Sequence, residues 1–222
     1  MLTENRSAAR ARVPQAAGLE RSRTMSNDIP PVAILISHRV ADYDAWKQAF
    51  DDHKSARVDA SCLGHHINRD ADDPNMVYVY CPAADVDKAK ALVDSPEIAE
   101  AMKNAGVEGP PTITLMTPKH SDFIADQKLP GMIVIHAVED YDAWRAAYDD
   151  FDDIRKQHGI VGHAVNQELG KPNQVLVYHQ ANDMASLRAF IDSTELKEGM
   201  ERAGVTEPPD IRFVEVSDFA EY

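Results

Sequence analysis

Short apolar runs alternate along this chain with segments whose apolar residues recur at helical spacing. Residues 32–40 are apolar and rich in β-branched side chains, which predicts a strand. Asp42 then stands where a helix N-cap is expected, and Trp46, Ala49, Phe50 and His53 follow on one face of the predicted helix. The pattern therefore starts with a strand followed by an amphipathic helix.

The next seventy residues complete one structural unit. Two strands joined by an Asp-Asp-Pro-Asn turn predict a hairpin, and two helical segments and a last strand follow. Ser95 and Pro96 are typical of a helix N-cap and first helical position, and Gly106 is placed to end that helix. The predicted strands are 32–40, 63–69, 76–81 and 112–117, with helices starting after Asp42, Asp85 and Ser95. The order β-α-β-β-α-β is the ferredoxin-like pattern.

The same unit occurs a second time. Val-Ala-Asp-Tyr-Asp-Ala-Trp at 40–46 returns as Val-Glu-Asp-Tyr-Asp-Ala-Trp at 138–144, an offset of 98 residues. The offset also pairs Gly64-His65 with Gly162-His163 and Pro110-Pro111 with Pro208-Pro209, without a gap. We expect an N-terminal arm outside the fold (1–29), a first module (30–118), a linker (119–130) and a second module (131–222).

Composition and charge narrow the class of function. The 222 residues carry a net charge of −14, which would repel nucleic acid and anionic membranes, so neither is an expected partner. Only two cysteines occur, Cys62 and Cys81, both in the first half, and the first 24 residues lack the apolar stretch of a secretory signal. We therefore expect a cytoplasmic protein with a small-molecule ligand.

The repeated motifs resemble a known group of proteins. V-x-D-Y-D-A-W, the D-D-P-N turn, D-S-x-E-L/I-x-x-x-M-x-x-A-G-V and P-P-x-I look like small proteins of the dimeric α+β barrel superfamily, labelled antibiotic-biosynthesis-monooxygenase-like or "cyclase" proteins. The resemblance implies an α+β fold in which two tandem ferredoxin-like modules form that barrel within one chain, as a pseudo-dimer; further homo-oligomerisation stays open. It also implies a superfamily that includes cofactor-free oxygenases, haem-handling enzymes and isomerases.

Two histidine positions recur in both copies, His38 with His136 and His65 with His163. These four histidines are the candidate catalytic residues. Buried packing positions more often hold Val, Ile or Leu, so a retained histidine indicates a general base acting on an acidic phenol or enol. The alternative is that these side chains only pack and satisfy their hydrogen bonds. If one site is active, we place it in the second half.

A metal site is the second hypothesis. We expect the first and third strands of a module to be parallel neighbours, which places His136, His163 and His179 at the same end of the sheet, and His38, His65 and Cys81 likewise in the first half. Three imidazoles could hold Fe, Cu or Zn. The alternative reading is three core-edge histidines bonded to carbonyls or facing water. We expect no cofactor, with a transition metal or haem as the alternatives.

Four aromatic residues are predicted to line a pocket between sheet and helices: Trp46, Trp144, Tyr80 and Tyr178. For the tryptophans, a role as core anchors is the alternative. His66 and His120 lack counterparts and are expected at the surface. Three functions therefore compete: a small-molecule enzyme of the monooxygenase or cyclase type, a metal-dependent oxygenase-type enzyme, and a non-catalytic binding or scaffold module.

Overall fold

The computed structural model describes residues 29–222, so the predicted arm lies outside the described residues except for its last one. The elements of the first module are β1 (Val32–Val40), α1 (Tyr43–Asp52), α2 (Lys54–Asp59), β2 (Gly64–Asp70), β3 (Met76–Ala83), α3 (Val86–Val93), α4 (Pro96–Asn104) and β4 (Val107–Asp122). Those of the second are β5 (Gly131–Ala137), α5 (Tyr141–Asp150), α6 (Asp152–Gln157), β6 (Ile160–Glu168), β7 (Lys171–Ala181), α7 (Met184–Asp192), α8 (Thr194–Arg202) and β8 (Asp210–Glu221).

The helices begin where the sequence places side-chain caps. The Asp42 carboxylate accepts the backbone N–H of Ala45 at 2.8 Å, and Asp140 accepts that of Ala143 at the same distance. Each cap satisfies one of the backbone donors that a first helical turn leaves open. Gly106 follows α4 with φ of 81°, a conformation that favours glycine and lets the chain turn into β4.

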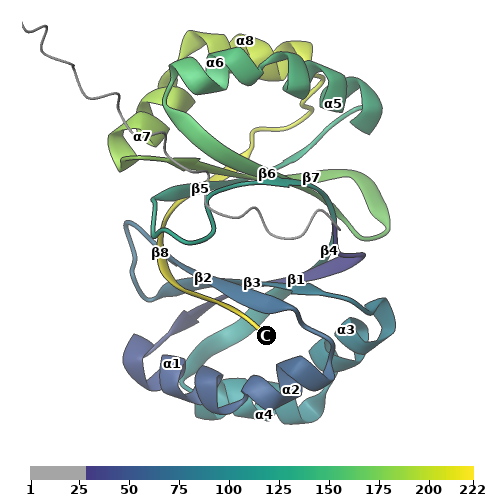
Figure 1. The fold of residues 1–222 in the computed structure, drawn as a ribbon, viewed down its shortest axis with the longest axis vertical. Coiled ribbons are helices and arrows are strands. Elements are labelled where there is room, and N and C mark those ends of the chain that lie inside the picture. The colour runs from purple at the N-terminus through teal and green to yellow at the C-terminus, as the bar shows by residue number, and fades with distance from the viewer. Residues whose placement is uncertain (1–28) are drawn as a thin grey trace, which may run out of the picture.

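The eight strands close into one barrel in the order β1-β3-β2-β8-β5-β7-β6-β4. Each module contributes a four-stranded sheet, and the helices cover the outer faces of the two sheets at opposite ends of the molecule (Figure 1). Closure pairs every strand on both sides, so the barrel leaves no sheet edge open to another chain. The predicted α+β barrel, formed within a single chain, is confirmed.

The direction of the strands differs from our expectation. β1 and β3 are neighbours but antiparallel, and so are β5 and β7. In the β-α-β-β order the helix crossover makes the first and second strands run the same way, and the hairpin then reverses the third. The expectation of parallel first and third strands was therefore wrong, which changes where the histidines lie.

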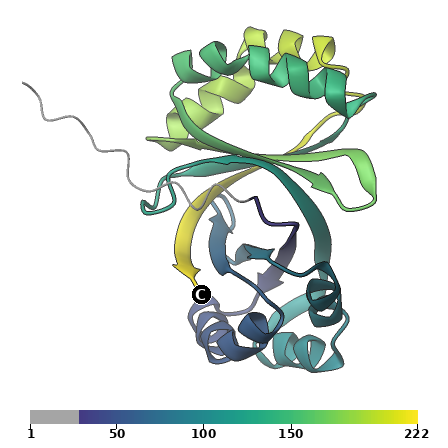
Figure 2. The ribbon, with the colours of Figure 1, turned by 45° about the vertical axis from the view of Figure 1, so that its right-hand side comes forward.

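The last strand of each module crosses to the other module. The end of β4 pairs with β6, with Asp122 opposite His163, and the end of β8 pairs with β2, with Ala220 opposite His65. The C-terminus consequently lies beside the first module's sheet and helices (Figures 1 and 2). Residues 119–122, assigned to the linker from sequence, belong to β4, because their backbone groups find partners on β6.

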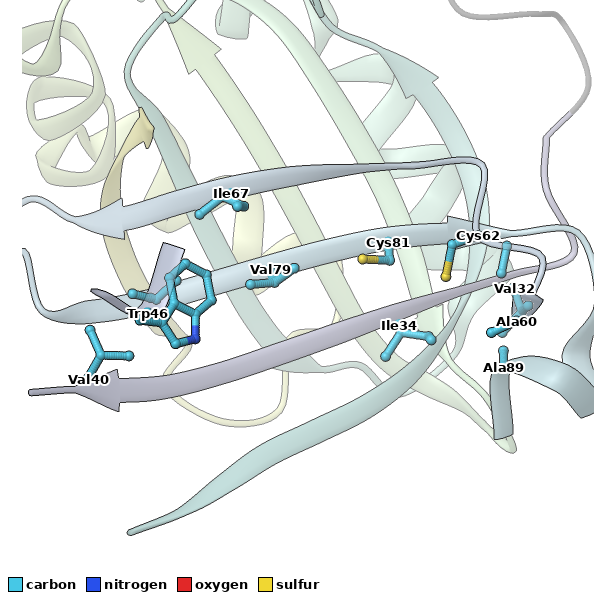
Figure 3. Packing of buried hydrophobic residues seen from close by; sticks show 12 residues of the cluster. Val32, Ile34, Val40, Trp46, Ala60, Cys62, Ile67, Val79, Cys81 and Ala89 are labelled. Atoms are coloured by element: carbon cyan, nitrogen blue, oxygen red, sulfur yellow. The ribbon is translucent and has the colours of Figure 1, made fainter. Parts of the chain in front are cut away.

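Strand alternation separates two kinds of core. Side chains on the outer faces meet the helices, as where Trp46 of α1 packs in one cluster with Val40 of β1 and Val79 of β3 (Figure 3). Side chains on the inner faces fill the barrel, among them Tyr78 and Tyr178. Within residues 29–222 there is no helix that combines the length and apolar character needed to cross a membrane.

Candidate active site

Each module contains a cavity of about 90 Å³ between its outer sheet face and its helices. Equivalent residues line the two cavities, including His38 with Trp46 in the first and His136 with Trp144 in the second. Both walls are mainly aliphatic and aromatic. The volume is below the roughly 300–1,000 Å³ of typical ligand pockets, so a ring-sized ligand requires the covering helices to shift.

His38 and His136 are buried without hydrogen-bond partners. Their exposed fractions are 5% and 6%, and no described group bonds either ring nitrogen of either residue. Each imidazole is tilted against the module's tryptophan, with ring centroids 5.4 and 5.5 Å apart. Burial lowers the pKa of both side chains to about 4, because the apolar surroundings disfavour the charged ring. Each is therefore a neutral imidazole with an open donor and an open acceptor.

The second cavity has a polar wall that the first lacks. The Tyr148 hydroxyl lies 2.9 Å from Nδ1 of His163 and 3.2 Å from Nε2 of His179. A hydroxyl has one proton, so it donates to one ring and accepts an N–H from the other. The corresponding positions in the first module are Phe50 and Cys81. Burial lowers the pKa of His163 to about 4 and raises that of Tyr148, so all three groups are neutral near pH 7.

His65 is held by the strand that crosses from the second module. Its Nε2 donates to the Asp218 carboxylate at 3.0 Å, and its Nδ1 accepts from the Tyr222 hydroxyl at 2.8 Å. Arg57 Nε in turn donates to the Tyr222 oxygen at 2.7 Å. Both nitrogens of His65 thus have hydrogen-bond partners, which leaves no lone pair for a substrate. The residue instead links the two modules through these hydrogen bonds.

Two further predictions from sequence need correction. Tyr80 and Tyr178 do not line the helix-side cavities but pack inside the barrel, because their neighbours in the strand take the outer face. His66 and His120 are not surface residues: both are half-buried, and the Nε2 atom of each is buried and has no partner. The His120 ring lies 4.7 Å from that of His163, since β4 crosses to β6.

Sequence reasoning missed several members of these sites. Arg57 and Arg155 are buried and stack on the rings of Phe50 and Tyr148, at 3.6 and 3.9 Å from the ring centroids. Their recurrence at the repeat offset was the available signal. Asp218 and Tyr222 gave no such signal, because only the strand crossing brings them to His65.

The antiparallel register does not support the three-histidine metal site. His136 stands opposite Val175 and His179 opposite Met132, so His136 and His179 lie at opposite ends of their cavity rather than at one end of the sheet. In the part of the chain that the structure describes, no three His, Cys, Asp or Glu side chains are grouped to hold a metal ion. In the first module, Cys81 stands opposite Ile34 by the same register, again away from His38. A cavity of about 90 Å³ is also far too small for haem.

Comparisons with known proteins agree on the fold. No protein-family model matches the chain, and no curated protein does. Among solved structures, an anthrone oxidase-like protein is 10% identical, with a TM-score of 0.64 over 88% of this chain and 94% of its own. A monooxygenase-like protein from Listeria innocua is 9% identical, with a TM-score of 0.52 over 86% and 96%.

A third structure has the same organisation. It is a ferredoxin-fold protein from Listeria monocytogenes related to antibiotic biosynthesis monooxygenases, 6% identical, with a TM-score of 0.52 over 85% of this chain and 96% of that one. Identities this low are evidence of common architecture only. Together with the closed eight-stranded barrel, these likenesses show that the chain shares the fold of these three structures, with two ferredoxin-like modules forming one α+β barrel in a single polypeptide.

Proposed function

We propose that the chain is a small-molecule enzyme of the monooxygenase type and that its active site is the cavity of the second module. The observation that carries the proposal is the buried imidazole of His136, whose two ring nitrogens lack a partner within an otherwise apolar cavity. An unpaired buried polar group costs roughly 1–3 kcal/mol. A ligand hydroxyl bonded to His136 accounts for that cost.

The neutral form of His136 determines which chemical groups of a ligand it can bind. A neutral imidazole accepts a hydrogen bond, and then a proton, from an acidic group that enters the cavity. With a pKa of about 4, His136 is a weak base, so the matching acid is one whose anion is strongly delocalised, such as an acidic phenol or the enol of an anthrone. The aromatic and aliphatic walls suit the ring of such a molecule.

Tyr148 and His179 add polar groups to the wall of the second cavity, at the end away from His136. Tyr148 and His179 line the cavity, whereas His163 is only partly buried and is bonded to the Tyr148 hydroxyl at 2.9 Å. The hydroxyl and the imidazoles can therefore bond a second polar atom of the ligand, while His136 takes its acidic proton. The first module, with Phe50 and Cys81 at the positions of Tyr148 and His179, lacks this polar wall, which favours the second cavity as the catalytic one.

The oxidation itself uses molecular oxygen as co-reactant. Proton loss gives a carbanion or enolate that donates electrons to O₂. One oxygen atom forms a carbonyl at the former CH₂ carbon, and the other leaves as water with the two hydrogens of that carbon. One CH₂ group and one O₂ thereby give one C=O and one H₂O. The protein positions the anion and excludes bulk water around it.

Helix α8 is the element that can make room for a ring. It covers the second cavity through Leu196, Gly199 and Met200, yet none of its residues is fully buried. Helix α7, by contrast, buries Leu187 and Phe190, so α8 is less firmly anchored in the core than its neighbour.

The test uses p-nitrophenol, whose absorption spectrum distinguishes phenol from phenolate. We expect the bound probe to ionise at a lower pH in the wild-type protein than in His136→Gln, because only the imidazole can accept the phenol proton. The matched variant His38→Gln should ionise the bound probe at the wild-type pH. The methyl ether p-nitroanisole, which has no acidic proton, should bind both proteins equally.

Oxygen chemistry is tested with dithranol, a dihydroxyanthrone, in an oxygen electrode. We expect wild-type O₂ uptake above the uncatalysed rate and a loss of about 10²-fold or more in His136→Gln, in line with general base catalysis. A bound p-nitrophenol that ionises at the same pH in the wild type and in His136→Gln would refute the role of His136. An ionised probe with no dithranol oxidation would refute the oxygenase assignment and leave a ligand-binding module.

A further inference from the structure

A groove on the surface of the second module adjoins the proposed active site. It has a volume of about 450 Å³ and lies between α5, α6 and α8. Ala147, Phe151 and Arg202 line both the groove and the cavity that contains His136, so the groove borders that cavity. Phe151 and Ile154 give it an apolar floor.

The walls of the groove are acidic. Asp150, Glu195 and Glu198 line it, and all three are exposed. Glu198 is paired with Arg202 at 3.7 Å, whereas Asp150 and Glu195 have no ion pair or hydrogen bond with any described residue. Two carboxylates without partners and one weakly paired carboxylate thus surround the only cation of the lining, Arg202.

From this arrangement we infer that the substrate of the second cavity is amphiphilic: a ring with an acidic hydroxyl or enol that reaches His136, and an organic cationic group, such as an amine, that lies in the groove between Asp150 and Glu195. The inference rests on the proposed function and adds the class of substrate. The unpartnered imidazole of His136, more than nine-tenths buried in the adjoining cavity, is the independent indication that a ligand enters here.

An amine fits this groove better than the other candidates. A metal ion does not fit, because in residues 29–222 no three side chains of the ligating types are grouped to hold one. An anionic tail would be repelled by the carboxylates. A neutral tail would gain from the Phe151 floor alone.

The experiment compares three phenols that differ only in the charge of the tail: tyramine (cationic), p-ethylphenol (neutral) and phloretate (anionic). The chain has two tryptophans, so a Trp46→Phe background leaves Trp144, in the wall of the second cavity, as the sole tryptophan and the reporter of binding. Quenching of Trp144 then gives dissociation constants for this cavity.

We expect tyramine to bind about three- to tenfold more tightly than p-ethylphenol, and phloretate to bind more weakly by a similar factor, as exposed charge pairs allow. Glu195→Gln/Glu198→Gln should make the three dissociation constants equal, because it removes two carboxylates and leaves Arg202 without its partner. The equivalent first-module variant Glu97→Gln/Glu100→Gln changes the net charge by the same amount and should keep the three dissociation constants different. About 1 M salt should also make the three dissociation constants equal. Thermal melting checks that each variant is folded.

The outcomes separate the two proposals. Equal dissociation constants for the three phenols, weakened together by His136→Gln, would overturn the cationic tail and leave the proposed function standing. If none of the three phenols binds while p-nitrophenol does, the cationic tail is overturned and the proposed function stands; if p-nitrophenol does not bind either, both are overturned. If tyramine still binds more tightly than p-ethylphenol and phloretate in the Glu195→Gln/Glu198→Gln protein, the preference for a cation arises outside the groove. That result would overturn the role of the groove.

Discussion

Replacing His136 by leucine should make the protein more stable while removing its proposed function. In the wild type both nitrogens of this imidazole are buried and unpaired, and the surrounding wall is apolar. Leucine has a similar size and no polar atom, so the substitution removes the penalty of an unsatisfied buried group, about 1–3 kcal/mol. For a chain of this size, that corresponds to a rise in Tm of about 2–4 °C per kcal/mol.

The gain in stability of His136→Leu over the wild type should increase as the pH falls. The pKa of His136 is lowered from 6.5 to about 4 in the folded protein, so between these values the unfolded chain binds more protons than the folded one. Stability is consequently lost as the pH falls from about 6.5 toward 4. Leucine removes this loss, and the advantage of the variant should grow by about 2 kcal/mol between pH 7 and pH 5.

Urea unfolding at pH 7 and pH 5 measures both effects. His38→Leu should behave in the same way, because its environment in the first module is equivalent. His65→Leu is the contrasting control: that ring is bonded to Asp218 and Tyr222, and its loss should destabilise the fold by about 1–3 kcal/mol. A His136→Leu protein that is less stable at pH 7, or whose advantage is the same at both pH values, would refute the reasoning.

Two other substitutions test the polar groups at the ends of the barrel. Tyr148→Phe should lower the free energy of unfolding by about 1–3 kcal/mol in urea titrations, because it leaves ring nitrogens of His163 and His179 unpaired; no change in stability would show that the hydroxyl is not their partner. Asp218→Asn should lower the pKa of His65 further, since the carboxylate opposes the effect of burial, and an NMR titration of that imidazole that matches the wild type would contradict the contact.

Local chemistry in the sequence predicted the repeated module and its elements. Asp42 and Ser95 mark helix starts, Gly106 marks a helix end, and the 98-residue offset identifies a duplication, all of which depend only on neighbours along the chain. The fold followed, because two such modules bury their sheets by pairing. The sequence likewise predicted that Trp46 and Trp144 lie between sheet and helices, from helical spacing alone.

Tertiary structure decided which histidines can act. In sequence all four histidines, His38, His65, His136 and His163, are equally retained by the repeat. His65 is nevertheless saturated by Asp218 and Tyr222, residues more than 150 positions away that lie at the crossing end of the chain. His136 lies instead where no polar group reaches it. The spacing of residues along the chain specifies the face of a strand, but strand direction and the partner strand specify which side chains meet across it. Strand direction and partner strand are set by the closure of the whole barrel. The sequence alone therefore determined the modules, whereas only the folded chain distinguished a histidine with both nitrogens bonded from one without a partner.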